Sequence, residues 1–444
     1  MKRFLSYSFL AVAVAIATAG LSKSASAEVS AETAFILNSL SFLMHGFLVM
    51  WMAAGFTMLE AGLVRTKNTT MQCTKNIGLY SIAGIMYWLI GYNLMYSGVD
   101  GGFIGSFSPW EANDAAITAD GFKANENNPY ASGSDWFFQM VFVATAASIV
   151  SGTVAERVKV IPFLIFTVVL TGLIYPIQGS WTWGGGWLNA MGFLDFAGST
   201  IVHSVGGWAA LTGALIIGAR KGKFNAQGGV NPLPGSNLPL ATLGTFVLWL
   251  GWFGFNGGSQ LAMGSAADIR DIASIYINTN LAAAAGAVVA IVATQVRYKK
   301  IDLTMVLNGA LGGLVAITAE PLAPTPGLAI VIGGIGAILV VVAVQLLDKL
   351  KIDDVVGAIP VHLVCGIWGT LAVVLSNSEA SLVTQVIGIA AIGVFVTIVS
   401  AIGWMLLKLT IGVRASEEEE YIGLDRAECG LEAYPEFGTG SQTL

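Results

Sequence analysis

Charged residues are scarce in this chain of 444 residues, since Asp, Glu, Lys and Arg together make up 11% of it. An average soluble domain carries about 25% charged residues, so this composition excludes an ordinary soluble protein. Cysteine is also rare, and Cys73, Cys365 and Cys429 do not have the spacing of metal ligands. The first two lie in apolar helical context, so we expect packing residues rather than disulfides. Hydrophobic residues, in contrast, reach 55%, and there are 54 glycines. This composition predicts an all-α polytopic membrane protein, with no soluble catalytic domain and no nucleic-acid partner.

The first 27 residues have the features of a cleavable signal peptide. Lys2 and Arg3 precede an apolar run at 9–20, and the small residues 25–27 follow it. The run is too short to span a bilayer, which favours a signal peptide at 1–27 over an additional membrane helix. The mature chain is then expected to begin near Glu28, outside the cytoplasm.

Apolar segments long enough to cross a bilayer fill most of the remaining chain. Eleven of them begin near residues 34, 76, 136, 160, 198, 238, 274, 303, 327, 356 and 383. With the mature N-terminus outside, sixteen of the 21 Lys and Arg residues fall inside, and only Lys123 and Arg270 fall outside. This bias predicts a multi-pass protein of the inner (plasma) membrane with a cytoplasmic C-terminus. We expect a transmembrane domain at 28–410 and a cytoplasmic tail at 411–444.

Histidine occurs only 3 times, and two of these residues share one motif. The pattern Asp-x2-Gly-x3-Val-His-x-Val-x-Gly starts at Asp195 and again at Asp354, so that His203 and His362 occupy the same position. Both copies lie at the start of an apolar segment. An ionisable side chain is costly there and usually marks a substrate or proton pathway.

The two copies of the motif are predicted to run in opposite directions, because they lie five spans apart. Such a pattern predicts inverted five-helix repeats, with the substrate path near the midplane of the membrane. Each histidine lies eight residues past its aspartate, which is about 12 Å at the helical rise of 1.5 Å per residue. From opposite faces of a core roughly 30 Å thick, the two imidazoles reach a similar depth. We therefore expect them to come close enough to touch.

A pair of histidines without nearby carboxylate or cysteine ligands makes a poor metal site, because zinc takes three or four protein ligands. No metal or other cofactor is expected. In an apolar passage, His203 and His362 offer donors and acceptors to a small neutral solute or to a proton. The alternative is that they only bridge helices through a polar contact. That alternative is the expectation for His45, which has no partner in the repeat.

Aromatic side chains gather in three segments that are predicted at the outer face: 181–187, 136–142 and 252–259. Aromatic residues at a membrane interface usually serve as anchors. Here they are mixed with Gly, Gln and Ser. The other interpretation is therefore a cation-π site that recruits an ammonium-like ion.

Several motifs together identify a family resemblance between about residues 34 and 435. They are Trp183-Gly-Gly-Gly, Asp195-Phe-Ala-Gly-Ser-Thr-Ile-Val-His203, Gly251-Trp-Phe-Gly-Phe-Asn256-Gly-Gly-Ser259, Ala155-Glu-Arg157 and Val361-His362-Leu-Val-Cys-Gly366. The chain resembles the Amt branch of the Amt/Mep/Rh ammonium transporters. This resemblance implies the ammonium transporter fold of eleven transmembrane helices in two inverted repeats. It also implies a homotrimer with one pore per subunit in a lipid bilayer.

The resemblance assigns an external ammonium site to Trp183, Phe142 and Ser259, with Gln139 lining the same vestibule. Asp195 is expected to hold this site together and to favour the cation, without necessarily being the proton acceptor.

Beneath that site, the resemblance implies a gate of stacked rings formed by Phe142 and Phe255, and a twin-histidine relay formed by His203 and His362. The implied function is electrogenic transport, in which NH4+ is deprotonated and NH3 and H+ are conducted through the pore. The protein is not expected to be an enzyme, because it lacks a nucleophile or metal set.

The C-terminal segment 409–434 resembles the cytoplasmic regulatory tail of the family, which implies a PII signal protein as a possible partner. Taken alone, the acidic run 417–420 predicts a solvated tail. Two alternative functions remain open: a neutral NH3 or CO2 channel of the Rh type, and an ammonium sensor. A sensor would normally continue into a signalling domain, whereas about 30 residues follow Arg414.

Two further details carry expectations about local structure. Glu60 lies five residues before Arg65 near the inner end of the first span, and we expect an interfacial ion pair for it rather than a role in the pore. Pro360 and Leu363 flank His362, and they leave open a different helix geometry at the second histidine.

Overall fold

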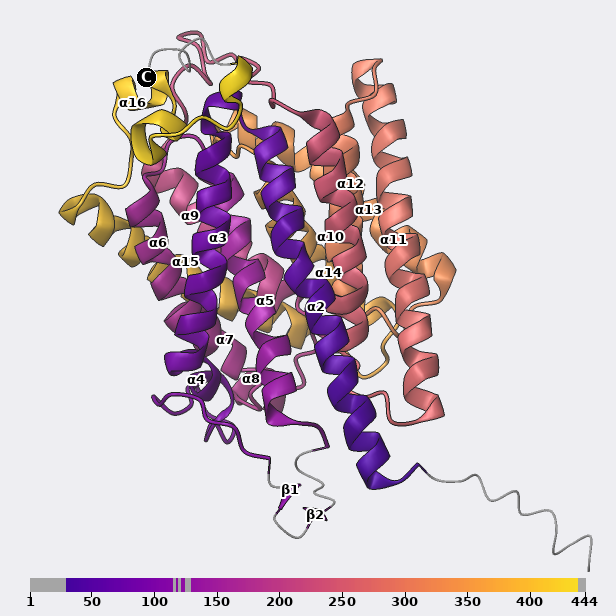
Figure 1. Cartoon of the computed structure of the whole chain (residues 1–444). Helices are drawn as coiled ribbons and strands as arrows, with labels where there is room; N and C mark the ends of the chain where they lie inside the picture. Colours follow the sequence, from indigo (N-terminus) through magenta and orange to yellow (C-terminus); the bar gives the residue numbers. More distant parts are fainter. Residues whose placement is uncertain (1–28, 115–116, 119–120, 124–128, 438–444) are drawn as a thin grey trace, which may run out of the picture.

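The structure is a computed structural model that describes residues 29–114, 117–118, 121–123 and 129–437. The predicted signal peptide at 1–27 lies outside the described residues. The described chain forms a bundle of long helices that run between two opposite faces (Figure 1). In these ranges, nine helical segments are long and apolar enough to cross a bilayer, and Leu303–Thr318 and Ile359–Leu375 are shorter apolar helices. The eleven predicted segments all correspond to these helices, which confirms the all-α polytopic membrane fold.

The first half of the bundle extends to the end of the first histidine motif. Its helices are α2 (Ala31–Leu63), α3 (Thr69–Met86), α4 (Tyr92–Tyr96), α5 (Ser132–Thr153), α6 (Val160–Val169), α7 (Tyr175–Ser180), α8 (Trp187–Ala190) and α9 (Val205–Ile217). Short 3-10 or π-helical turns are found at Thr66–Asn68, Tyr87–Gly91, Leu170–Ile174 and Ser199–Ser204. The strands β1 (Ile117–Thr118) and β2 (Gly121–Phe122) form a small antiparallel pair between α4 and α5.

The second half contains the second motif and the tail. Its helices are α10 (Leu238–Gly258), α11 (Ala266–Tyr298), α12 (Leu303–Thr318), α13 (Pro326–Lys349), α14 (Cys365–Ala372), α15 (Leu382–Thr410) and α16 (Glu417–Ile422). The 3-10 or π-helical turns of this half are Ile359–Val364, Val373–Leu375, Asp425–Cys429 and Pro435–Phe437.

Local sequence signals fix where several long helices begin. The side chain of Asn237 accepts a hydrogen bond from the Leu240 N–H at the start of α10, and Ser265 forms a capping box with Asp268 at the start of α11. These side chains satisfy N–H groups that have no partner within the helix. At α13, the side chain of Thr325 caps the helix ahead of a proline, whose missing N–H costs nothing at that position.

Glycines let the helices approach one another backbone to backbone. A Cβ atom on Gly286 of α11 would lie 2.2 Å from the carbonyl oxygen of Gly309 in α12. A Cβ atom on Gly244 of α10 would lie 2.4 Å from the backbone nitrogen of Leu59 in α2. Neither position has room for any side chain. Because lipid provides little hydrophobic drive between helices, such close packing is a main source of their association.

The C-terminal tail packs against one end of the bundle, where α16 lies at the top of Figure 1. We call this end the tail face. Asp425 accepts hydrogen bonds from the N–H groups of Thr70 (3.0 Å) and Met71 (2.8 Å) at the start of α3. Glu428 accepts one from Val160 at the start of α6 (3.0 Å). The tail therefore caps two helices of the first half. Within the acidic run, Glu420 is buried and forms an ion pair with Arg414 rather than being solvated.

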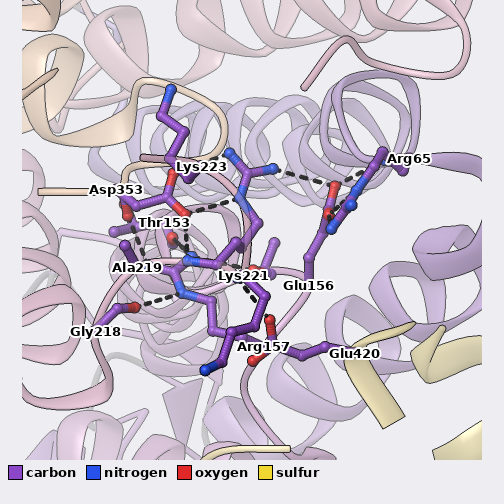
Figure 2. A network of polar contacts seen from close by, with 12 residues as sticks. Arg65, Thr153, Glu156, Arg157, Gly218, Ala219, Lys221, Lys223, Asp353 and Glu420 are labelled. Atoms are coloured by element: carbon purple, nitrogen blue, oxygen red, sulfur yellow. Dashed lines mark hydrogen bonds and ion pairs between the residues drawn. The ribbon is translucent and has the colours of Figure 1, made fainter. Parts of the chain in front are cut away.

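A buried arginine, Arg157, ties three parts of the chain together at the tail face (Figure 2). Its guanidinium donates to the carbonyl oxygens of Thr153 (2.5 Å) and Ala155 (3.0 Å) at the end of α5. It also reaches the carbonyl of Gly218 after α9 (3.2 Å) and the carbonyl of Asp353 ahead of the second motif (2.6 Å). Through its hydrogen bond to Asp353, Arg157 therefore holds the segment that leads into the turn with His362.

The side chain of Asp353 is held by Arg220, whose Nε and Nη2 donate to its two oxygens at 2.8 and 2.9 Å. Burial acts to raise the pKa of Asp353, but these hydrogen bonds and the charges of Arg220 and Arg157 hold it well below its usual value. Arg220 also pairs with Glu156 (3.3 Å), which in turn binds Arg65 (Figure 2). The expected interfacial ion pair between Glu60 and Arg65 is therefore wrong, because Arg65 is engaged by a carboxylate of another helix end.

Candidate functional site

The two histidine motifs adopt the same local structure. In each copy the glycine has a positive φ, 106° at Gly198 and 80° at Gly357, which a residue with a side chain rarely adopts. A π-helical turn follows and contains the histidine: Ser199–Ser204 in the first copy and Ile359–Val364 in the second. Pro360 does not change this geometry, because it lies in the first turn, where its missing N–H is tolerated.

The aspartates of the motifs accept hydrogen bonds from the turns that follow them. Asp195 accepts four backbone N–H groups, from residues 198–201, at 2.8–3.1 Å. Asp354 accepts the N–H of Ile359 (2.7 Å) and the hydroxyl of Thr153 (3.0 Å). Burial raises the pKa of Asp195 to about 6, although the four N–H groups act to lower it. Each aspartate thus sets the start of the turn that presents its histidine.

The two imidazoles meet in the interior of the bundle. The Nδ1 atoms of His203 and His362 lie 3.1 Å apart, and the rings are stacked with centroids 5.2 Å apart. Their exposed fractions are 0% and 3%. The expected contact between the two histidines is therefore present. Within the part of the chain that the structure describes, Nε2 of His203 is buried without a hydrogen-bond partner, so it is free to bind a small solute.

Aromatic rings form a column that leads to this pair from the face opposite the tail. Trp183 meets Phe142 edge to face with centroids 6.0 Å apart, and Phe142 stacks on Phe255 at 4.0 Å. Phe255 in turn lies 5.1 Å from His203. Phe142 and Phe255 are both buried, so in this conformation the stacked rings separate the histidine pair from the face opposite the tail.

Ser259 and Gln139 lie one helical turn from this column. The hydroxyl of Ser259 donates to the carbonyl of Phe255 (2.8 Å) at the end of α10. The amide of Gln139 is 3.5 Å from Asp135, one turn earlier on α5. The indole nitrogen of Trp183 donates to the carbonyl of Asp195 (3.0 Å). The structure therefore joins Trp183, Phe142, Phe255 and both histidines directly, whereas Ser259 and Gln139 contact their own helices.

Two further residues lie beside the histidines, although neither was among the expected site residues. Trp252 stacks on His203 with centroids 5.0 Å apart, and its indole donates to the hydroxyl of Thr318 (2.8 Å). Phe56 of α2 lies 6.0 Å from the ring of His362. Both belong to apolar helices in which every aromatic side chain looks alike, and only the tertiary packing distinguishes them.

Cavities adjoin the pair on its tail-face side. A small cavity of about 10 Å³ is lined by His362, Phe56, Glu60 and Asn308, among others. A larger one of about 460 Å³ opens nearer the tail face and includes Asn308 and Asp354. The two share Asn308, Val356 and Gly357 as lining residues. This arrangement outlines a route from the histidines towards the tail face.

The site combines two buried imidazoles with an aromatic column in an apolar bundle. Across the described ranges, no group of three or more His, Cys, Asp and Glu residues is positioned to hold a metal ion. The geometry suits the passage of a small hydrogen-bonding solute and of protons. The fold and the site thus define a membrane transport protein with a buried histidine pair.

Comparison with known proteins gives the family. The model of the Ammonium Transporter Family matches residues 40–434. The ammonium transporter Amt2 of Archaeoglobus fulgidus is 40% identical, with 96% of this chain and 94% of that protein covered. An ammonium transporter of Bacillus subtilis is 34% identical, with 88% and 97% covered. The chain belongs to the ammonium transporter family, so it is a transport protein and not an enzyme.

Solved structures agree on the fold. A structure titled as a sensor Amt protein superposes with a TM-score of 0.83 and 37% identity, covering 89% of this chain and 98% of that one. Mep2 of Candida albicans superposes with a TM-score of 0.77 and 25% identity, covering 88% and 89%. The predicted ammonium transporter fold is confirmed.

Proposed function

We propose that this protein is an electrogenic ammonium transporter, which recruits NH4+ at the face opposite the tail, deprotonates it and conducts NH3 and H+ through a twin-histidine pore. The observation that carries the proposal is the buried contact of 3.1 Å between His203 and His362, beneath the stacked rings of Phe142 and Phe255. Membership of the ammonium transporter family supports ammonium as the substrate.

Recruitment involves five residues. Trp183 and Phe142 offer π faces that attract a cation. The hydroxyl of Ser259 and the amide of Gln139 replace part of the hydration that the ion loses. Asp195 favours the cation electrostatically and steadies the indole of Trp183 through the hydrogen bond from the indole nitrogen to its carbonyl.

Deprotonation accounts for selectivity. A charged group in an apolar pore is costly, whereas neutral ammonia carries no charge and is much less costly to place there. Potassium has a similar size but cannot lose its charge. In the histidine pair one imidazole donates and the other accepts, so a proton can cross from His203 to His362 while ammonia passes. One positive charge then crosses the membrane in each cycle, which makes transport electrogenic.

We assign residues 1–27 to a cleavable signal peptide, 28–410 to the transmembrane domain and 411–444 to a regulatory tail. The bias of basic residues supports a cytoplasmic tail face and an outside mature N-terminus in the inner (plasma) membrane. We also propose a homotrimer, and a PII signal protein as the possible partner at the tail face. Asp425 and Glu428 accept hydrogen bonds from the starts of α3 and α6. A partner that bound the tail would therefore act on the positions of these two helices.

A sensor of ammonium is the second candidate, and the similarity to the structure titled as a sensor Amt protein favours it. A neutral NH3 or CO2 channel of the Rh type would also use the histidine pair. It would have less need of the cation site around Trp183.

Current from purified protein in liposomes after a jump in ammonium tests the proposal. We expect a current that saturates with ammonium and is absent after an equal jump in potassium. Ammonium binding without current would favour the sensor, and ammonia flux without current would favour the neutral channel. Either result would refute electrogenic transport.

A further inference from the structure

A buried carboxylate, Glu60, lies beside the histidine pair on its tail-face side. It belongs to α2 and is 1% exposed. One of its oxygens, Oε2, accepts hydrogen bonds from the Ser151 hydroxyl (2.8 Å) and from the amides of Gln72 (3.0 Å) and Asn76 (3.1 Å). Three donors on one oxygen hold the side chain in a single position.

The other oxygen of the carboxylate, Oε1, has no hydrogen-bond partner among the residues that the structure describes. Glu60 lines the same small cavity as His362. That cavity, of about 10 Å³, has room for one water molecule. Ser148 and Asn308 also line it, so a water there would have polar neighbours besides the carboxylate and the imidazole. A water in this cavity would therefore lie beside both Glu60 and His362, which line it.

Lys75 of α3 supplies the balancing charge. It is fully buried, and its ammonium donates to the carbonyl of Ser151 (2.8 Å), whose hydroxyl binds Glu60. The ammonium also lies 5.0 Å from the ring centroid of Phe163. A buried charge without a partner is very costly, so Lys75 and Glu60 compensate each other. A purely structural role explains why Oε2 accepts three hydrogen bonds. It does not explain why Oε1 has no hydrogen-bond partner among the described residues, in a side chain that lines the same cavity as a pore histidine.

We propose that Glu60 carries the proton between His362 and the cavity at the tail face. This inference rests on the proposed function, since it concerns the proton that follows ammonia. In the step, the N–H bond of the His362 imidazolium breaks, and its proton passes through one water to Oε1 of Glu60, so that the carboxylate becomes a carboxylic acid. The O–H bond then breaks, and the proton leaves towards the larger cavity, which borders the small one at Asn308 and Gly357. Lys75 is a positioning residue that allows the carboxylate to re-form.

Glu60→Gln tests the proposal with the least structural change. The amide oxygen can still accept the three hydrogen bonds that Oε2 accepts, while the amide nitrogen that replaces Oε1 cannot bind and release a proton. Current and ammonia flux are measured on the same liposomes, the flux from the pH change that entering ammonia causes inside. Positioned proton-transfer groups commonly contribute about 100-fold or more, so we expect the current to fall at least about tenfold while ammonia flux is retained.

Asp271→Asn is the matched control, since it makes the same chemical change in an exposed ion pair with Arg270. We expect native current from it. A native current from folded Glu60→Gln would overturn the proposal. If Glu60→Gln fails to fold, the double variant Glu60→Gln/Lys75→Met removes both buried charges together. A native current from this double variant would also overturn the proposal. Absence of ammonium current in the native protein would instead reject the proposed function, and with it the proton that Glu60 is proposed to carry.

Discussion

The Nδ1 atoms of His203 and His362 lie 3.1 Å apart, with both rings buried. Two neutral imidazoles can share such a hydrogen bond only as complementary tautomers, with the hydrogen on Nδ1 of one ring and on Nε2 of the other. Moving one proton across the bond therefore changes which outer nitrogen can accept the next. This coupling is the physical basis for the proton path that we propose beside ammonia.

The stacked rings of Phe142 and Phe255 predict a gate. We expect Phe255→Leu to raise ammonia flux, because it removes a ring that covers His203, while potassium remains excluded. The lost stacking should lower stability by about 0.5–1.5 kcal/mol. Flux into liposomes, measured by stopped flow, tests the first expectation. Phe246→Leu is the control, since that ring lies on the same helix but is 62% exposed. Identical flux in the two variants would argue against a gate.

The raised pKa of Asp195, about 6, predicts how stability depends on pH. The ordinary pKa of an aspartate is about 3.8. At pH values between about 3.8 and about 6, the folded state therefore binds more protons at Asp195 than the unfolded state does. Stability from this group is therefore greatest at low pH and falls as the pH rises through that window. We expect the advantage in Tm of the native protein over Asp195→Asn to shrink from pH 4 to pH 6 and to stay level above it.

Thermal unfolding of both proteins in the same detergent, from pH 4 to pH 8, measures this difference. Asp268→Asn, at the exposed start of α11, is the control, and we expect no comparable trend for it. An advantage of the native protein that grows with pH would contradict the assignment.

The ion pair between Arg220 and Asp353 is expected to matter for stability because both side chains are buried. Asp353→Asn leaves Arg220 without its main partner, and breaking a buried pair in this way typically costs about 3–5 kcal/mol. Chemical unfolding in detergent measures the loss. Glu417→Gln removes a pair with Lys221 that is exposed, and we expect no measurable change from it. A similar, small effect from both variants would show that the network is not important for stability.

The docking of the tail is expected to depend on Asp425, which caps the start of α3. Asp425→Ala should cost about 0.5–2 kcal/mol, the usual range for a lost helix cap. It should also make the tail after Thr410 more sensitive to limited proteolysis. Glu418→Ala, in the exposed part of the acidic run, is the control. Equal protease sensitivity of the two variants would contradict a docked tail.

Sequence patterns predicted the long-range features that depend on repetition. The two copies of the motif predicted that His203 and His362 would meet, and apolar length predicted the positions of the helices. Both signals can be recognised without knowledge of packing, because a histidine in an apolar segment and a long apolar run are each unusual in a sequence.

The partners of single buried charges could not be predicted in the same way. Arg65 follows Glu60 closely in the sequence, yet it binds Glu156, 91 residues away, and Glu60 turns inward to Ser151. Proximity along a helix end suggested the wrong pair, because the fold brings α5 beside α2. The contacts of Phe56 and Trp252 with the histidines are equally tertiary, since the aromatic segment 252–259 did not indicate that Trp252 would stack on His203.

Currents from liposomes that contain His203→Ala test the central claim most directly, compared with the native protein for equal jumps in ammonium and in potassium. The account predicts that the native protein conducts only with ammonium, and that the variant either loses this current or begins to conduct potassium. A variant that kept a saturable ammonium current and still excluded potassium would contradict the histidine relay.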